Sequence, residues 1–169
     1  MQFNGKEIVL AALFGAWGIA LPVLFHMIGL GSIFLPMFIP LAIMGFFVNF
    51  PLALLNGLLI PIVSSLLTGM PPLYPPLAII IALETGALAG TISLCYRYFK
   101  WNICVSLFIG IAVERTILVL AALWIAPLFD FPPYLLSLGS FTASMPGIIL
   151  IIILVPLIVK SVERLHKYK

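Results

Sequence analysis

The chain has 169 residues, of which 64% are hydrophobic and only 8% are charged, and its formal net charge is +3. A soluble domain carries roughly 25% charged residues, so this chain has too few polar side chains to cover a water-exposed surface. The high hydrophobicity also excludes a disordered chain, and the few basic residues form no patch of the kind that binds nucleic acid. The class that remains is a single transmembrane domain covering residues 1–169.

Long apolar stretches predict an all-α membrane protein with six transmembrane helices. A spanning helix needs about 20 predominantly apolar residues, and the polar–apolar alternation of a membrane barrel is missing. One helix across the second and third stretches would be about 52 Å long, too long for a bilayer, so we expect two. The predicted spans are Glu7–Met27, Ile33–Val48, Pro51–Leu67, Tyr74–Tyr96, Asn102–Ala126 and Phe141–Val159.

Basic residues predict the orientation of these spans. Apart from Arg115, all of them lie at the two termini or in the connection between the fourth and fifth spans. They are Lys6, Arg97, Lys100, Lys160, Arg164, Lys167 and Lys169. Because Lys and Arg accumulate in cytoplasmic loops, we expect both termini to be cytoplasmic.

Prolines mark two segments near the predicted outer face. Pro36 and Pro40 in the second span free backbone carbonyls and kink the helix, and such backbone must face protein or a cavity inside a membrane. The segment Thr68–Pro76 holds four prolines, which predicts a stiff, extended connection. Two interpretations stay open for this connection: a rim or lid of an outward-facing binding site, or a tight connector between two helices.

Three charged side chains fall inside the predicted spans: Glu84, Glu114 and Arg115. Each costs roughly 2.5–3.5 kcal/mol at the bilayer centre, so such residues are functional candidates. Glu84 and Arg115 lie at similar depth, which leaves open an inert ion pair between them or a site for a polar ligand. Glu114 and Arg115 are neighbours, so we expect their side chains to point about 100° apart. Asn56 predicts a hydrogen bond between helices, with ligand contact as the alternative.

Small residues recur every four positions in the first span, at Ala12, Ala16 and Ala20. Such a ridge allows a second helix to approach closely. The fourth span carries a similar ridge, formed by Ala78, Ala82, Gly86 and Gly90. Each ridge serves internal packing if it faces the bundle, and it forms a docking face for another membrane protein if it faces outward.

The chain contains none of the short catalytic motifs that would indicate an enzyme. The phosphate loop of ATPases, the H-E-x-x-H zinc motif and the G-x-S-x-G nucleophile elbow are all missing. Cys95 and Cys104 show no metal-ligand spacing, and His26 is interpreted as an interfacial residue. We therefore expect a protein that is not an enzyme and that uses no cofactor or metal.

Residues 29–40, 61–72 and 82–90 resemble the substrate-binding (S) components of energy-coupling factor (ECF) vitamin transporters. The most specific part is Thr-Gly-Met-Pro-Pro at 68–72 with the Ser-Ser pair upstream. The six spans and the alanine motif of the first span are also similar, and the resemblance extends to about residue 120. It implies a subunit in the prokaryotic plasma membrane that captures a vitamin from outside. Such a subunit then joins a transmembrane T component and two cytoplasmic ATPases.

The resemblance also implies which residues bind. By position, the substrate lies near the outer face, around Phe38, Met70, Tyr74, Glu84, Arg115 and Tyr134, with Asn56 as a further candidate. The T component packs on the first-span alanines, here Ala12, Ala16 and Ala20. Related sequences often carry His where this chain has Phe38.

The substrate and the functional class both leave alternatives. The branch that carries Thr-Gly-Met-Pro-Pro is similar to the one proposed for pantothenate, hydroxymethylpyrimidine or cobalamin, and the residues do not choose among these three. Two other classes stay open: a stand-alone ion-coupled carrier of a small organic solute, and a membrane scaffold without transport.

Overall fold

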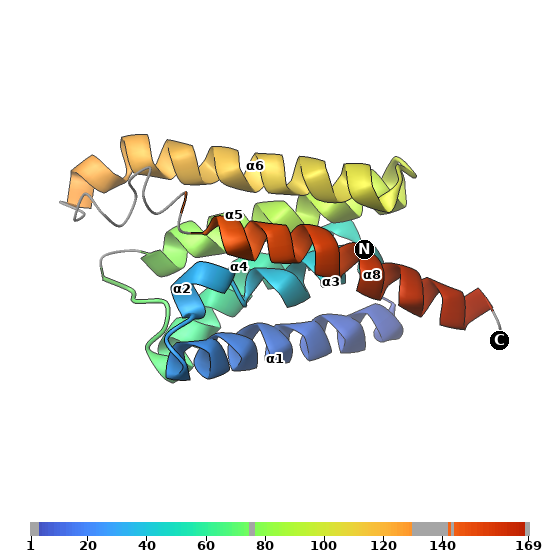
Figure 1. Cartoon of the computed structure of the whole chain (residues 1–169), viewed down its shortest axis with the longest axis horizontal. Coiled ribbons are helices and arrows are strands. Elements are labelled where there is room, and N and C mark those ends of the chain that lie inside the picture. Colours follow the sequence, from blue (N-terminus) through green and yellow to red (C-terminus); the bar gives the residue numbers. More distant parts are fainter. Residues whose placement is uncertain (1–3, 75–76, 130–141, 143, 168–169) are drawn as a thin grey trace.

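The computed structural model describes residues 4–74, 77–129, 142 and 144–167, and every regular element in these residues is a helix. The long helices, which lie side by side in Figure 1, are α1 (Gly5–Met27), α4 (Phe50–Thr68), α5 (Leu77–Ser93), α6 (Ile103–Trp124) and α8 (Met145–Lys167). The short ones are α2 (Gly31–Phe34), α3 (Phe38–Phe47), the π-helical turn η1 (Leu94–Tyr98) after α5 and the 3-10 turn η2 (Ala126–Phe129) after α6. The all-α prediction is confirmed for the described residues.

The two ends of the bundle differ in what they hold. In Figure 1, α1 begins and α8 ends at the right, together with η1, and this end is termed the terminal end. The opposite end holds the close of α1, the short helix α2 and the connection from α4 to α5, and it is termed the α2 end. A chain that starts and finishes at one end of a bundle needs an even number of passes.

Five of the described helices are long and apolar enough to cross a membrane, with mean hydropathy between 1.9 and 2.5. They are α1, α4, α5 with η1, α6 and α8, which correspond to five of the six predicted spans. The sixth, predicted as Ile33–Val48, is a broken segment formed by α2 and α3. Since α3 has 10 residues, it extends for about 15 Å and is too short to span a bilayer alone.

Pro36 breaks the second segment instead of kinking it. A residue before proline is disfavoured in the right-handed helical region, and Leu35 adopts a left-handed conformation with φ 48° and ψ 52°. Pro40 falls in the first turn of α3, where its missing N–H removes no intrahelical bond. The prediction of a kinked helix is therefore wrong: the helix is interrupted at Pro36, and Pro40 causes no kink.

The second and third segments are separate helices, as expected from their combined length. Val48 is extended, with φ −114° and ψ 145°, and it ends α3. The Asn49 side chain then caps α4 by accepting a hydrogen bond of 3.2 Å from the Leu52 amide. Satisfying a free N–H at a helix start in this way favours a new helix over a continued one.

The short helix α3 lies at the centre of the bundle. All nine residues from 38 to 46 are buried, so the helix presents no face to lipid. It packs against α1, α5 and α8. At Gly45 an added Cβ would lie 2.7 Å from the Ala89 carbonyl oxygen, so α3 and α5 touch backbone to backbone there. A helix that is apolar on all faces is the kind expected in a core.

The ridge of small residues on α5 serves internal packing. Its four members, Ala78, Ala82, Gly86 and Gly90, are all buried. Glycines allow α4 and α5 to approach closely, because a Cβ at Gly57 would lie 2.6 Å from the Thr85 carbonyl oxygen. At this crossing the Thr85 hydroxyl donates a 2.7 Å hydrogen bond to the Gly57 carbonyl. Close contact between small residues is a main source of helix association in membranes.

Gly57→Ala is expected to destabilise the protein by about 1–3 kcal/mol, because the new methyl group must displace backbone atoms of α5. The matched control is Gly5→Ala, where an added Cβ meets nothing within 4 Å. Thermal unfolding in detergent measures both variants. A Gly57→Ala protein that melts at or above the wild-type temperature contradicts the close α4–α5 packing.

Candidate binding site

A cavity of about 320 Å³ lies at the α2 end, beside the break between α2 and α3. The end of α1, the α2–α3 segment, the connection after α4 and the start of α5 all contribute to its wall. The lining residues are Pro22, His26, Gly31, Leu35, Pro36, Met37, Phe38, Met70, Pro71, Pro72, Leu77 and Ile81. Among the described residues of this lining, His26 has the only polar side chain and none has a charged one. Pockets of this size with few polar groups are typical small-molecule sites.

The cavity exists because α3 is shorter than the helices around it. At 1.5 Å per residue α3 is about 15 Å long, whereas its neighbours with 17 to 23 residues are about 25 to 35 Å long. Between the first residue of α3 and the α2 end, the centre of the bundle therefore holds no long helix. Met37 and Phe38, which are 5% and 4% exposed, close the floor of this space.

The wall formed by residues 70–72 is fastened to the last turns of α4 by hydroxyl groups. Ser64 Oγ donates a 2.7 Å hydrogen bond to the Met70 carbonyl, and Ser65 Oγ donates to the Pro71 carbonyl. Thr68 Oγ1 accepts from the Met70 amide at 3.2 Å. The Ser-Ser pair and the Thr-Gly-Met-Pro-Pro run therefore form one structural unit. A wall held in place before binding loses little entropy when a ligand arrives.

Two contacts orient the imidazole of His26 in the cavity wall. Its Nδ1 lies 2.7 Å from the Pro22 carbonyl oxygen. A carbonyl only accepts, so Nδ1 carries the proton and Nε2 of the neutral ring is an acceptor. The ring also lies against Gly31, where an added Cβ would overlap three ring atoms. Sequence analysis predicts only an interfacial residue at His26. Its contact with Gly31 joins two helices, α1 and α2, and a local sequence pattern does not show such a contact.

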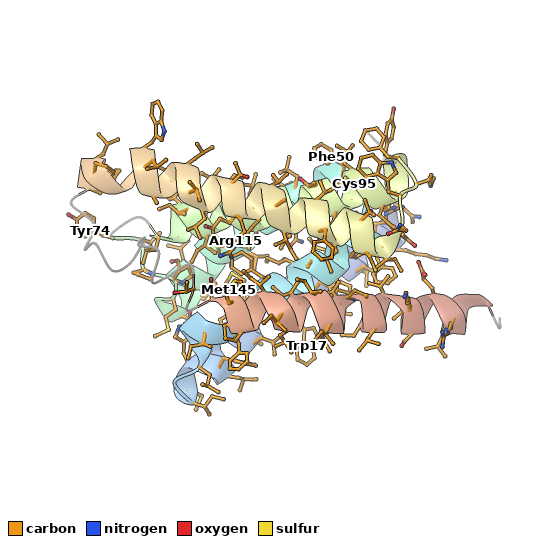
Figure 2. All side chains as sticks on the ribbon, turned by 45° about the horizontal axis from the view of Figure 1, so that its top comes forward. Trp17, Phe50, Tyr74, Cys95, Arg115 and Met145 are labelled. Atoms are coloured by element: carbon orange, nitrogen blue, oxygen red, sulfur yellow. The ribbon has the colours of Figure 1, made fainter. Side chains whose placement is uncertain are left out.

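The charged side chains at membrane depth pair differently from the prediction. Arg115 binds its own neighbour Glu114 through two hydrogen bonds, Nε to Oε2 at 2.6 Å and Nη2 to Oε1 at 2.7 Å. Arg115 Nη1 also donates to Ser144 Oγ at 3.1 Å, and Figure 2 shows Arg115 between α6 and α8. The expected divergence of the two side chains is wrong, because both are long enough to bend back toward each other.

Glu84 does not form the ion pair with Arg115 that the sequence left open. It is 4% exposed, and its Oε1 has no hydrogen-bond partner among the described residues. Glu114 and Arg115 are close enough to act on it electrostatically. Both Glu84 and Arg115 are directed into the bundle, with the Arg115 side chain 12% exposed. Neither residue lines the α2-end cavity.

The structure brings together two of the predicted ligand contacts, since Phe38 and Met70 both line the cavity. Tyr74 is 80% exposed and is not a lining residue of the cavity. Figure 2 shows its side chain at the α2 end of the bundle. Asn56 Nδ2 donates a 3.0 Å hydrogen bond to the Ala11 carbonyl, which confirms the predicted bond between helices. Tyr134 lies outside the described residues.

Comparison with known proteins adds no family to these observations. No family model matches the chain, and no curated protein and no solved structure matches it. The described residues form an apolar pocket with one oriented imidazole, that of His26. In small-molecule sites of this kind, apolar walls generally give affinity and polar groups give orientation.

Ser64→Ala is expected to loosen the 70–72 wall, because the Met70 carbonyl then loses the hydroxyl of a fully buried serine. The Met70 carbonyl keeps only the 3.2 Å hydrogen bond from Thr68 Oγ1, and the loss of one hydrogen bond costs about 0.5–1.5 kcal/mol. Hydrogen exchange of the amides in residues 69–74 should become faster. The control is Ser161→Ala, whose hydroxyl bonds to the Leu157 carbonyl on an exposed face of α8. Equal exchange in wild type and Ser64→Ala argues against a fastened wall.

Proposed function

We propose that this protein is the substrate-capture subunit of an ECF-type importer in the prokaryotic plasma membrane. It binds a vitamin or vitamin precursor in the α2-end cavity. The observation that carries this proposal is the cavity wall, which is built from Phe38 and from Met70–Pro72 of the resembling motifs. The hydroxyl bonds from α4 give those motifs a structural role in the cavity wall, which supports this proposal. The protein itself performs no chemistry on the substrate.

The lining supports an uncharged ligand with a flat ring surface and a hydrogen-bond donor that reaches His26. Nε2 of His26 offers one acceptor, and the other side chains offer van der Waals contact. A carboxylate buried in such a wall would lose its hydration without gaining a partner. Of the three candidate substrates, hydroxymethylpyrimidine therefore fits better than pantothenate, and cobalamin is much larger than a 320 Å³ cavity.

The first-span alanines support a partner surface on α1. Ala12, Ala16 and Ala20 are all exposed, while the opposite face of α1 turns Gly15 and Gly18 inward against Ile60 of α4. The ridge thus has the outward direction that docking requires. We propose that it packs on the T component, which couples the subunit to two ATPases on the cytoplasmic side of the terminal end.

One observation favours a second candidate, a stand-alone ion-coupled carrier. Glu84 is a buried carboxyl group at membrane depth with an unpartnered oxygen, and such groups mark proton or ion pathways in transporters. Uptake by the chain alone in sealed vesicles, driven by an ion gradient, distinguishes this function from capture. The capture subunit is expected to bind substrate in such vesicles without accumulating it.

Mass spectrometry of molecules that copurify with the protein identifies the ligand, and Ile81→Trp tests where it binds. Ile81 lines the cavity, and the larger indole is expected to fill it and abolish retention of the copurified molecule. The control is Ile79→Trp, two residues earlier on α5 and 52% exposed. Folding of both variants is checked by size exclusion. If a folded Ile81→Trp retains ligand as wild type does, the cavity is not the site.

Ala16→Trp is expected to separate ligand binding from assembly, because Ala16 is exposed and does not line the cavity. Binding by the isolated chain should stay within about twofold of wild type, since no contact to the cavity changes. Association with a T component and ATP-driven uptake should be lost. Ile153→Trp, at a 57% exposed position on α8, is the control. Normal uptake by Ala16→Trp would contradict docking on this ridge.

A further inference from the structure

The terminal end of the bundle carries nearly all of the charge outside the membrane-depth cluster. The described basic residues of its elements are Lys6, Arg97, Lys100, Lys160 and Arg164, and the described acidic ones are Glu7 and Glu163. Among the described residues, the α2 end has no Lys or Arg. A surface with this excess of positive charge attracts anionic groups.

Both acidic residues at this end are already bound. Glu7 Oε1 lies 2.6 Å from Arg97 Nη1, and Glu7 Oε2 accepts a 2.6 Å hydrogen bond from Asn49 Nδ2. Glu163 accepts a hydrogen bond from the Tyr96 hydroxyl. These bonds connect α1 with η1 and α8 with η1. Among the described residues, no carboxylate side chain at this end is left for Lys100, which makes no ion pair with any of them.

Arg97 is held along one edge only. Its Nη1 contacts Glu7 and also donates to the Phe47 carbonyl at 2.7 Å. Nε and Nη2 have no hydrogen bond to a described residue, and the side chain is 35% exposed. A guanidinium that is fixed in this way presents its remaining donors in a set direction, which suits the planar recognition of a phosphate.

A cavity of about 420 Å³ opens between these cations, lined by Phe46, Phe47, Tyr96, Arg97, Lys100 and Trp101. The turn that follows η1 brings Lys100 to it. Lys100 has a left-handed φ of 59°, and the Trp101 amide closes the turn by donating to the Cys95 carbonyl at 3.0 Å. The cavity therefore combines two cations with an aromatic wall.

The surroundings of this cavity are those of a membrane interface. Tyr98, Phe99 and Trp101 are exposed around the turn, and they are the residue types that concentrate at the level of lipid headgroups. Trp101 also lines a second cavity of about 280 Å³, whose other lining residues are Asn102, Val105 and Ile109 at the start of α6. A largely apolar groove that shares a wall with a basic cavity in this way suits an acyl chain below a headgroup.

We propose that the terminal end binds one anionic phospholipid. Its phosphate lies between the Arg97 guanidinium and the Lys100 ammonium, and an acyl chain follows the groove past Val105 and Ile109. Basic pockets between membrane helices bind lipid headgroups in this way, with the positive charge at the level of the headgroups. The lipid would fix the η1 turn, which already connects to α1 and α8. The site is independent of the substrate cavity at the other end.

The test uses the full chain in nanodiscs of phosphatidylglycerol or phosphatidylcholine with identical acyl chains, followed by native mass spectrometry of retained lipid. Wild type is expected to retain phosphatidylglycerol and not phosphatidylcholine. Lys100→Gln should lower this retention by about fivefold, as expected for one basic residue near a lipid surface. Lys160→Gln removes an exposed lysine at the same end that does not line the cavity. It should retain lipid as wild type does.

A second variant keeps the test decisive if Lys100→Gln fails to fold. Val105→Trp, at a 41% exposed position, blocks the groove and leaves both cations in place. It should also lose the lipid. Equal losses in Lys100→Gln and Lys160→Gln would overturn the proposal in favour of general attraction to a basic surface. Displacement of the lipid by inorganic phosphate, or full retention in Val105→Trp, would overturn the lipid assignment in favour of a phosphate site.

Discussion

The complete enclosure of α3 is the constraint on which the rest of the structure depends. A helix whose residues 38–46 are all buried cannot face lipid, so α1, α5 and α8 must surround it. A helix of 10 residues cannot cross the bilayer either, so it ends inside the bundle. Backbone that ends at membrane depth must be covered by protein or line a cavity. Pro36 places that ending at the α2 end, and the cavity follows from it.

The two ends of the bundle are stabilised by different chemistry. At the α2 end, hydroxyl groups of Ser64 and Ser65 reach carbonyls of the same connection, so the wall is held without charge. At the terminal end, Glu7 and Arg97 join α1 to η1 through an ion pair. Neutral hydrogen bonds depend little on salt, whereas the Glu7–Arg97 ion pair, whose Arg97 side chain is 35% exposed, is screened by salt in part. The division places charge where water and headgroups are available.

The length of the apolar stretches predicted most of the helices, since an apolar run of about 20 residues has few alternatives in a membrane. The combined length of the second and third stretches predicted that α3 and α4 are separate helices, and the structure adds the Asn49 cap that starts α4. The contact of His26 with Gly31 and the packing of α4 on α5 at Gly57 depend on other elements, which local patterns do not report. The pairing of Arg115 with Glu114 escaped prediction because side-chain length outweighed the 100° offset of their Cα positions.

The position of that ion pair on a single helix has a consequence for how the chain enters the membrane. During synthesis, helices enter the bilayer one after another, and a charge whose partner lies on a later helix stays unpaired until that helix is inserted. Glu114 and Arg115 are paired from the start, because α6 carries both the acid and its base. The helix enters the lipid as a unit without net charge at that point. Its insertion is thereby independent of when α8 arrives with Ser144 to complete the contacts of the guanidinium.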